Sequence, residues 1–354
     1  TGNTNTFIGW QSGYAVTDTS NKTAIGYRAG YADGGAFDVF IGYEAGRNVT
    51  AGDNIGIGRG AGTGYHGVGQ TEFQSNTTNR YNISIGTFAG TKAIGTNSVN
   101  VGHNAGYYAT GSNNTFVGSA AGKGGTTSAP FSSGQNNVAL GYQALTNFTT
   151  GGANVALGHS ALKNIASGQS NIAIGYQALL DADNNEEFNI AIGTNAMENL
   201  NYNGSGNNIA LGLNAMQGGS ITAQITDNIA IGQYTLASIT TADEQVAIGG
   251  WALYGLTTGT ANIGIGYEAM KVHTTGDKNI AIGYGAIAER ISFNNIISIS
   301  SPEKNSRELV QSCIKQCGVA IVSTIASACI SGSRNVVVFS ALNRSRNIIK
   351  TEDP

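Results

Sequence analysis

Asn171-Ile172-Ala173-Ile174-Gly175-Tyr176-Gln177-Ala178 is the clearest copy of the phrase that decides the fold of this chain. It reads as Asn, a β-branched residue, a small residue, an aliphatic residue, Gly, two variable residues and Ala. Thirteen of the fifteen spacings between copies are 16 to 20 residues, most often 17. A fixed period of this length indicates a repeat architecture. The sixteen copies are anchored on Gly9, Gly26, Gly42, Gly58, Gly86, Gly102, Gly118, Gly141, Gly158, Gly175, Gly193, Gly212, Gly232, Gly249, Gly266 and Gly283.

The columns of the repeat predict a short strand in each copy. The residue directly before the Gly is Ile, Leu or Val in all sixteen copies, and the residue three before it is Ile, Val or Thr. This alternation predicts a strand of four or five residues, with both aliphatic residues facing the interior. The residue between them is usually Ala or Gly, so we expect that opposite face to approach another backbone closely.

A unit of about 17 residues cannot bury its apolar face alone, whereas stacked units form a continuous core. At the strand spacing of a sheet, sixteen coils would span roughly 75 Å. The glycines are expected where the chain turns out of each strand. Helical and leucine-rich solenoids have longer repeats, and the calcium-binding nonapeptide solenoid needs an Asp ladder. The sequence therefore predicts an all-β fold, a parallel β-roll (β-solenoid) of about 16 coils.

Asn stands four residues before the Gly in twelve copies. Stacked in a solenoid, these amides can bond to the copies above and below as a ladder. The predicted structural ladder contains Asn54, Asn82, Asn114, Asn137, Asn154, Asn171, Asn189, Asn208, Asn228, Asn262 and Asn279.

Composition excludes several other classes of protein. The 354 residues include 52 Gly but only 3 Pro, and the Gly has no three-residue period, so collagen does not fit. Only 11% of residues are charged, which argues against intrinsic disorder. Residues 1–290 hold 11 Lys or Arg against 17 Asp or Glu, so no nucleic-acid partner is expected. The most apolar run, 318–330, is too short to cross a bilayer, so no membrane insertion is expected within this chain.

The repeat resembles the head repeats of YadA-like trimeric autotransporter adhesins, and still more the repeat arrays of bacteriophage tail fibres and appendages. The resemblance runs from Asn3 to about Glu289. It implies a left-handed roll, a homotrimer of chains packed about a threefold axis, and attachment to a host surface. Implied partners are further copies of the chain, other virion or surface-fibre proteins, and a host cell-surface polysaccharide or protein receptor. The implied location is the virion or an extracellular surface. The chain departs from the adhesin heads in its longer repeat and in lacking a coiled-coil stalk or membrane anchor.

Three segments are predicted. Block A, residues 1–135, has copies that end in Ala-Gly or Ser-Gly, with insertions at 63–80 and 122–135. Block B, residues 136–290, has copies that end in Leu, Met or Ile after the Ala. In residues 291–354 the phrase degrades, although 297–300 and 335–340 keep the alternation, so we expect further coils and a tip. Residues 303–316 could instead form a short helix.

The column directly after the Gly holds an aromatic or imidazole ring in nine copies. Two interpretations stay open: the rings pack between neighbouring chains, or they form a ladder that stacks on the sugars of a host glycan. The candidate glycan-binding residues are Trp10, Tyr27, Tyr43, His103, Tyr142, His159, Tyr176, Tyr267 and Tyr284.

No catalytic, metal or cofactor site is expected. The glycines of 56–62 and the sequence 158–162 resemble a phosphate loop and a nucleophile elbow, but both fall on the repeat register. Cys313, Cys317 and Cys329 lack a fourth ligand for zinc. The acidic pairs at 181/183 and 186/187 sit in one turn, where a solvated loop is expected.

These features predict a non-enzymatic fibre, the structural and receptor-binding part of a phage tail fibre or appendage. A bacterial trimeric surface adhesin is the first alternative, and a polysaccharide-degrading tailspike is the second.

Overall fold

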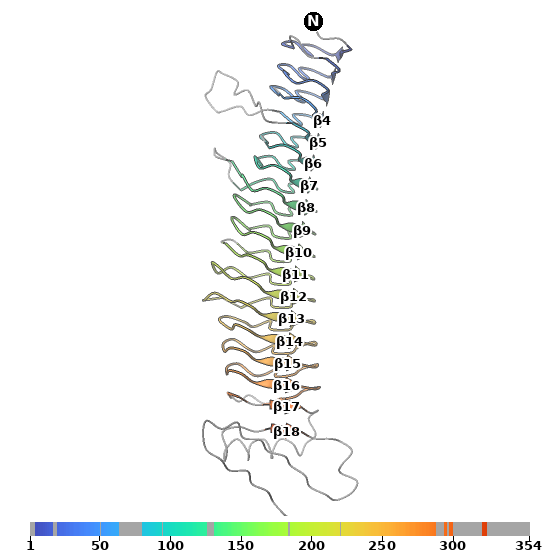
Figure 1. Cartoon of the computed structure of the whole chain (residues 1–354). Coiled ribbons are helices and arrows are strands. Elements are labelled where there is room, and N and C mark those ends of the chain that lie inside the picture. Colours follow the sequence, from blue (N-terminus) through green and yellow to red (C-terminus); the bar gives the residue numbers. More distant parts are fainter. Residues whose placement is uncertain are drawn as a thin grey trace, which may run out of the picture.

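In a computed structural model the chain is a parallel β-solenoid (Figure 1). The structure describes residues 4–16, 20–49, 51–63, 80–93, 95–125, 131–182, 185–219, 221–287, 294–295, 297–299 and 321–323. Within these residues every regular element is a strand. The predicted all-β solenoid is confirmed, whereas its assembly into a trimer stays a prediction.

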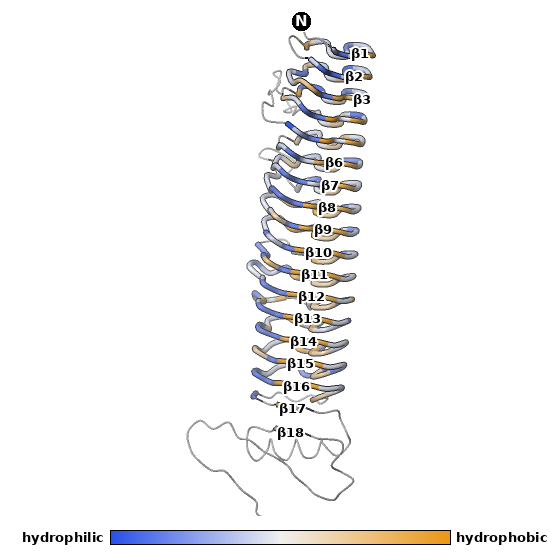
Figure 2. Tube along the Cα trace, turned by 45° about the vertical axis from the view of Figure 1, so that its right-hand side comes forward, coloured by the Kyte–Doolittle hydropathy of each residue, from blue (hydrophilic) through white to orange (hydrophobic). Residues whose placement is uncertain are grey.

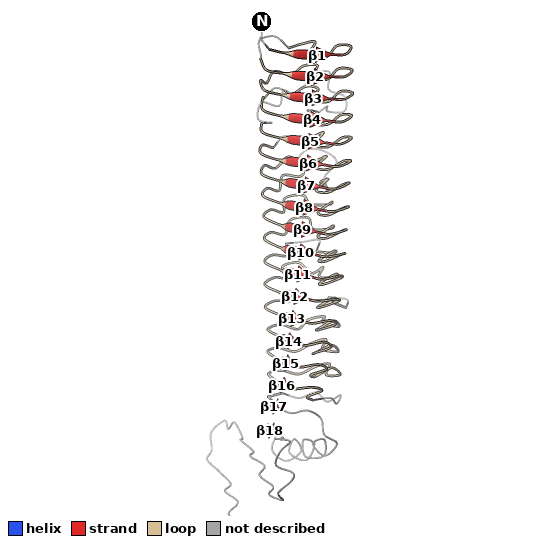
Figure 3. Cartoon of the chain, turned by 90° about the vertical axis from the view of Figure 1, so that its right-hand side faces the viewer, coloured by secondary structure: helices blue, strands red, loops and turns tan. Residues whose placement is uncertain are grey.

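Eighteen strands form one sheet in which each strand pairs in parallel with the next along the chain (Figure 3). Identical columns of the repeat stay in register: Ile172 of β10 lies beside Ile190 of β11, and Ala173 beside Ala191. The strands are β1 Thr6–Ile8, β2 Thr23–Ile25, β3 Val39–Ile41, β4 Ile55–Ile57, β5 Ile83–Ile85, β6 Val99–Val101, β7 Thr115–Val117, β8 Val138–Leu140, β9 Val155–Leu157, β10 Ile172–Ile174, β11 Ile190–Ile192, β12 Ile209–Leu211, β13 Ile229–Ile231, β14 Val246–Ile248, β15 Ile263–Ile265, β16 Ile280–Ile282, β17 Ile297–Ile299 and β18 Ile321–Ser323.

Each strand has three residues, shorter than the four or five expected, because left-handed backbone flanks it on both sides. In the coil of β10, Ser170 has φ 57° and Gly175 has φ 139°. A Cβ at Gly175 would overlap the carbonyl oxygen of Gly193 in the next coil. Only glycine combines this φ with this close approach, which explains its presence in every copy.

The prediction that both aliphatic columns face the interior is wrong. In β10 the middle residue, Ala173, is fully buried, whereas Ile174 is 37% exposed. The middle residue is likewise buried in the other strands from β2 to β16, whereas all three residues of β1 are exposed. The coil is narrow, so its interior accepts the small residue, and the alternation of the strand then turns the two larger residues outward.

The interior is filled in two ways. In β8 to β15 the small strand residue faces a buried Leu or Met four positions after the Gly, such as Leu145, Leu162, Met197 or Leu253. In β1 to β7 that position is Gly, and in β1, β3 and β7 the strand itself supplies the large residue, a Phe. Phe40 and Phe116 are buried in this way, and a Cβ at Gly46 or Gly122 would overlap their rings.

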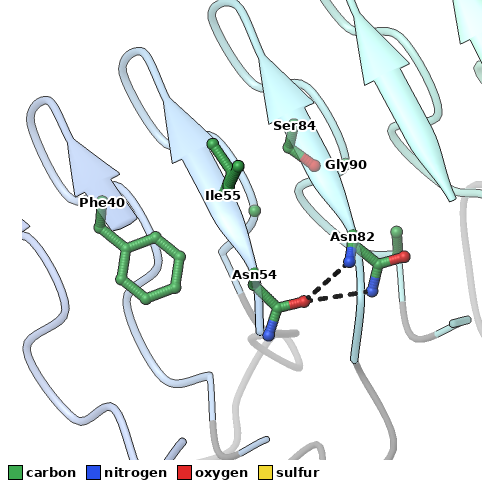
Figure 4. A pocket seen from close by; sticks show the side chains of 8 residues that line it. Phe40, Asn54, Ile55, Asn82, Ser84 and Gly90 are labelled. Atoms are coloured by element: carbon green, nitrogen blue, oxygen red, sulfur yellow. Dashed lines mark hydrogen bonds between the residues drawn. The ribbon is translucent and has the colours of Figure 1, made fainter. Parts of the chain in front are cut away.

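The apolar core is interrupted among the coils of β4 to β6. One buried cluster covers Ala24 to Val49 and the other starts at Ala105. The strand residues between them are Gly56, Ser84 and Asn100, each facing a Gly. A cavity of about 10 Å³ lies here between Phe40 and Ser84 (Figure 4). At its edge the Oδ1 of Asn54 accepts hydrogen bonds from the backbone N–H and from the side-chain Nδ2 of Asn82.

The sheet crosses the predicted block boundary without a break, because β7 pairs in register with β8. Residues 64–79 of the first predicted insertion and residues 126–130 of the second lie outside the described residues. Of the predicted C-terminal segment, β17 continues the sheet from β16 at the 297–300 sequence, and β18 pairs with β17. The three Cys, the 335–340 alternation and the possible helix at 303–316 lie outside the described residues.

Candidate functional site

The outward-facing aliphatic columns form a continuous apolar face along the rod. The hydrophobic positions of successive strands lie above one another as a stripe (Figure 2). Ile41, Ile57, Ile85, Leu140 and Ile192 are all more than a third exposed, and Leu140 reaches 48%. A soluble single chain rarely exposes an apolar surface of this extent, and such a surface usually marks an interaction site.

The predicted aromatic column lies two residues beyond the outer aliphatic residue, along the edge of this face. Its rings stack on each other in short ladders. The ring centroids of Trp10 and Tyr27 are 5.0 Å apart, and those of Tyr27 and Tyr43 are 4.9 Å apart. A second ladder joins Tyr142, His159 and Tyr176, and a third joins Tyr267 and Tyr284. His103 contacts the amide of Asn104, its neighbour in sequence.

This stacking bears on the two interpretations of the rings. A ring inside a ladder has both faces covered by the rings above and below, so it presents its edge to the outside. Sugars stack on ring faces. Tyr27, between Trp10 and Tyr43, therefore has no open face, and it is also approached by the guanidinium of Arg28 at 5.2 Å. This geometry argues against a glycan-stacking role for an interior ring such as Tyr27.

The predicted asparagine residues lie in one buried column and bond to each other. The Oδ1 of Asn154 accepts the backbone N–H of Asn171 at 3.0 Å and its Nδ2 at 3.2 Å. The Nδ2 of Asn171 also donates to the carbonyl of Glu186 at 2.7 Å. The same pattern continues through Asn189 and beyond. Each Asn side chain therefore links its coil to a neighbouring coil. The Asn171 side chain also bonds to the turn between β10 and β11.

Charged residues replace asparagine in the column at two coils near the N-terminal end. Lys22 and Asp38 occupy the ladder position of the coils of β2 and β3, and both are buried. The Nζ of Lys22 lies 2.6 Å from the carboxylate of Asp33, also buried, and 4.0 Å from that of Asp38. One ammonium group thus faces two carboxyl groups inside the solenoid.

Burial raises the pKa values of both carboxyl groups. The pKa of Asp38 is raised to about 8, first by burial and then by the charge of Asp33, despite the N–H donated by Asn54. The pKa of Asp33 is also raised by burial, although the charge of Lys22 opposes that shift. We therefore assign a proton to Asp38 at neutral pH, because Asp33 makes the closer ion pair with Lys22.

The remaining sequence candidates that fall in the described residues do not come together as a reactive site. The side chain of Ser160, in the predicted elbow-like sequence, is buried. Glu186 is buried as well, while Asp181 accepts a bond from Asn164 at 2.6 Å; Asp183 lies outside the described residues. Among the described residues, no three His, Cys, Asp or Glu side chains gather as a metal site would require.

A cluster of aromatic rings around Lys92, at one corner of the solenoid, was not expected from the sequence. Backbone hydrogen bonds stack Lys92 on Tyr107 and Tyr108 on Lys123, in the coils that follow β5 to β7. The Nζ of Lys92 lies 5.0 Å from the centroid of Tyr108 and 5.3 Å from that of Phe131. Burial lowers the pKa of Lys92. The missed signal is in the sequence: residues 73–180 contain no Asp or Glu.

Comparison with known proteins found no matching family model, no similar curated protein and no similar solved structure. Within the described part of the chain, no helix long and apolar enough to span a membrane is found.

Proposed function

We propose that this chain is a structural and receptor-binding part of a phage tail fibre or appendage, assembled as a homotrimer and attached to a host-surface glycan. The observation that carries the proposal is the apolar face of the sheet, which runs along β1 to β16 and needs a partner of the same length and shape. Another copy of the same rod meets both requirements. A closed ring of identical faces buries each one completely.

The number three and the viral setting come from the resemblance of the repeat, whereas the need for a partner comes from the exposed aliphatic columns. The aromatic ladders at the edge of the face would pack at the rim of the interface, as amphipathic rings commonly do. The two carboxyl groups that converge on Lys22, those of Asp33 and Asp38, are buried in the interior, which favours attachment over cleavage of a polysaccharide.

The test is the mass of the purified chain by light scattering, compared between the wild type and charged variants. We expect three chains for the wild type. Ile174→Glu with Ile192→Glu, which places two charges on the face, should give smaller species, whereas Asn147→Glu on an exposed corner should leave the mass unchanged. A wild type that is monomeric at all concentrations would overturn the proposal.

A further inference from the structure

The buried cluster of Lys22, Asp33 and Asp38 differs from the polar positions of most other coils. Its three side chains lie in the coils of β2 and β3 and are at most 2% exposed. Most other coils have Asn, a neutral amide, at the ladder position that Lys22 and Asp38 occupy. Burying an ammonium group and carboxyl groups costs more free energy than burying neutral side chains of similar size, even when the charges are paired. Stability of the coil alone therefore does not explain this cluster.

The cluster holds an amine against a carboxyl group. The Nζ of Lys22 lies 2.6 Å from the Oδ2 of Asp33 and donates to the backbone carbonyl of Asp33 at 2.9 Å. The other carboxyl oxygen of Asp33 accepts the backbone N–H of Gly35 at 3.0 Å. Both groups are thus oriented by bonds to the fold. Groups fixed at contact distance react far faster than the same groups free in water.

Asp38 supplies an acid beside this pair. Its Oδ1 accepts the N–H of Asn54 at 2.8 Å. Its Oδ2 is buried, lies 4.0 Å from the Nζ of Lys22 and has no hydrogen-bond partner among the residues that the structure describes. Burial, followed by the charge of Asp33, raises the pKa of Asp38 to about 8, so this group carries a proton at neutral pH. A carboxyl group that keeps its proton can act as a general acid.

We infer that Lys22 and Asp33 join in an intramolecular amide (isopeptide) bond, with Asp38 as the general acid. The ammonium group of Lys22 first gives a proton to the carboxylate of Asp33, and burial favours the resulting neutral amine and carboxylic acid. The lone pair of Nζ then attacks Cγ of Asp33 and forms the N–C bond. Asp38 donates its proton to the departing hydroxyl group and takes up a proton from the nitrogen. One water molecule leaves, and Asp38 returns to its starting state.

The product suits the interior better than the two charges do. The bond replaces an ammonium group and a carboxylate by one N–H and one carbonyl oxygen, the groups that an Asn side chain presents at the ladder position. It closes residues 22–33 into a covalent ring that contains β2 and the turn after it. Such a ring restrains its coil when the surrounding hydrogen bonds break. Asp38 stays buried beside the bond, so burial still raises its pKa. The inference is independent of the proposed function.

The experiment measures the mass of the intact, denatured wild-type chain by mass spectrometry. We expect a mass lower than that of the sequence by one water molecule. Trypsin cuts after Arg28 and Arg47, but not after an acylated Lys22. The digest should therefore contain fragment 29–47 joined to the fragment that includes Lys22 and ends at Arg28.

A second ion pair is the internal control for burial. The Nζ of Lys271 lies 2.7 Å from the carboxylate of Glu268, close to the distance in the buried pair, but these side chains are 33% and 31% exposed. If proximity alone were sufficient, this pair would join as well. We expect that it does not join and that trypsin cuts after Lys271.

Variants separate the roles of the three groups. Lys22→Arg keeps the positive charge but removes the nucleophilic amine, and its mass should equal that of its sequence. Asp38→Asn introduces the residue that most coils have at this position. It should leave most of the freshly purified chain unjoined, because a positioned acid accelerates such a step by about a hundredfold or more. Lys271→Gln should lose one water molecule as the wild type does.

The other outcomes contradict the inference. A wild type that keeps its full mass would reduce the cluster to a buried ion pair. Loss of water without joined fragments would assign the change to a succinimide at the Asp33–Gly34 bond, and would overturn the isopeptide bond as well. Complete joining in Asp38→Asn would overturn the role of Asp38. None of these results affects the oligomer mass by which the proposed function is tested.

Discussion

At the scale of single residues, the ladder position tolerates a charge only when other groups compensate for it. Asp38 stands where most coils have Asn, and its carboxyl Oδ1 still accepts the N–H of Asn54 at 2.8 Å, as an Asn oxygen would. What Asp38 lacks is the amide donor, and a proton restores one. The raised pKa follows from this position and from the neighbouring Asp33.

The raised pKa predicts that the N-terminal coils lose stability as the pH rises. Between about pH 4 and pH 8 the folded state binds this proton more tightly than the unfolded state, so the free energy of unfolding falls across that window and levels off above it. Asp38→Asn should remove most of this pH dependence and stabilise the coils of β2 and β3 at pH 8. Amide exchange of those coils at pH 5.5 and pH 8, corrected for intrinsic rates, measures the effect.

The matched control is Asp53→Asn, an exposed carboxylate in the following coil, which should leave the pH dependence in place. If Asp38→Asn and the wild type lost amide protection in parallel as the pH rose, the proton on Asp38 would not be the cause of the pH dependence of stability.

At the scale of the coil, two arrangements fill the same interior. In the coil of β7 the strand supplies Phe116 and the turn supplies Gly122, whereas in the coil of β8 the strand supplies Ala139 and the turn supplies Leu145. Gly122 and Leu145 have the same backbone φ, 52°. The large and small residues have exchanged places with no change in the path of the chain.

This exchange predicts strong coupling between Phe116 and Gly122. Phe116→Ala should leave a cavity and cost about 3–5 kcal/mol of local stability. Gly122→Leu should clash with the ring and cost about 1–3 kcal/mol. The double variant copies the coil of β8 and should be more stable than the Phe116→Ala single variant, as measured by urea titration with amide exchange of neighbouring coils. If the stability cost of the double variant equalled the sum of the two single costs, Phe116 and Gly122 would not be exchangeable in this way.

The sequence predicted the period, the strand positions, the turning glycines and the asparagine column, because each follows from identical coils stacked in register. It did not predict which strand face is buried. An alternation such as Ile172-Ala173-Ile174 defines two faces, and only the narrow width of the coil decides that Ala173 is inside. The rings around Lys92 were missed because Tyr108 and Phe131 come from the following coils and meet the lysine only when the coils stack.

At the scale of the whole molecule, the interrupted core predicts where the rod opens first. Buried Phe occurs in the coils of β3 and β7 but not in that of β5, where Ser84 borders the cavity. Amide exchange in the coils of β4 to β6 should therefore be faster than in those of β10 to β14, where every coil has a buried Leu or Met. Ser84→Phe would place a ring opposite Gly90 in the coil of β5, as Phe40 and Phe116 do in β3 and β7. We expect it to add about 1 kcal/mol of local stability and so to slow this exchange.

If Ser84→Phe accelerated exchange in these coils, the interior there would be too narrow for a ring, and the cavity would not be the cause of their lower stability.

The in-register backbone bonds between coils also determine how the rod responds to force. Bonds such as Gly175 N–H to Leu157 carbonyl, 2.8 Å long, point along the axis of the rod. Tension applied to its two ends would therefore load the bonds of one terminal coil at a time. Coils would peel away in turn, each releasing about 60 Å of extended chain for a repeat of 17 residues. A fibre of this kind lengthens by nearly equal steps under a pull and dissipates work at each step, while the coils that have not yet peeled keep their structure.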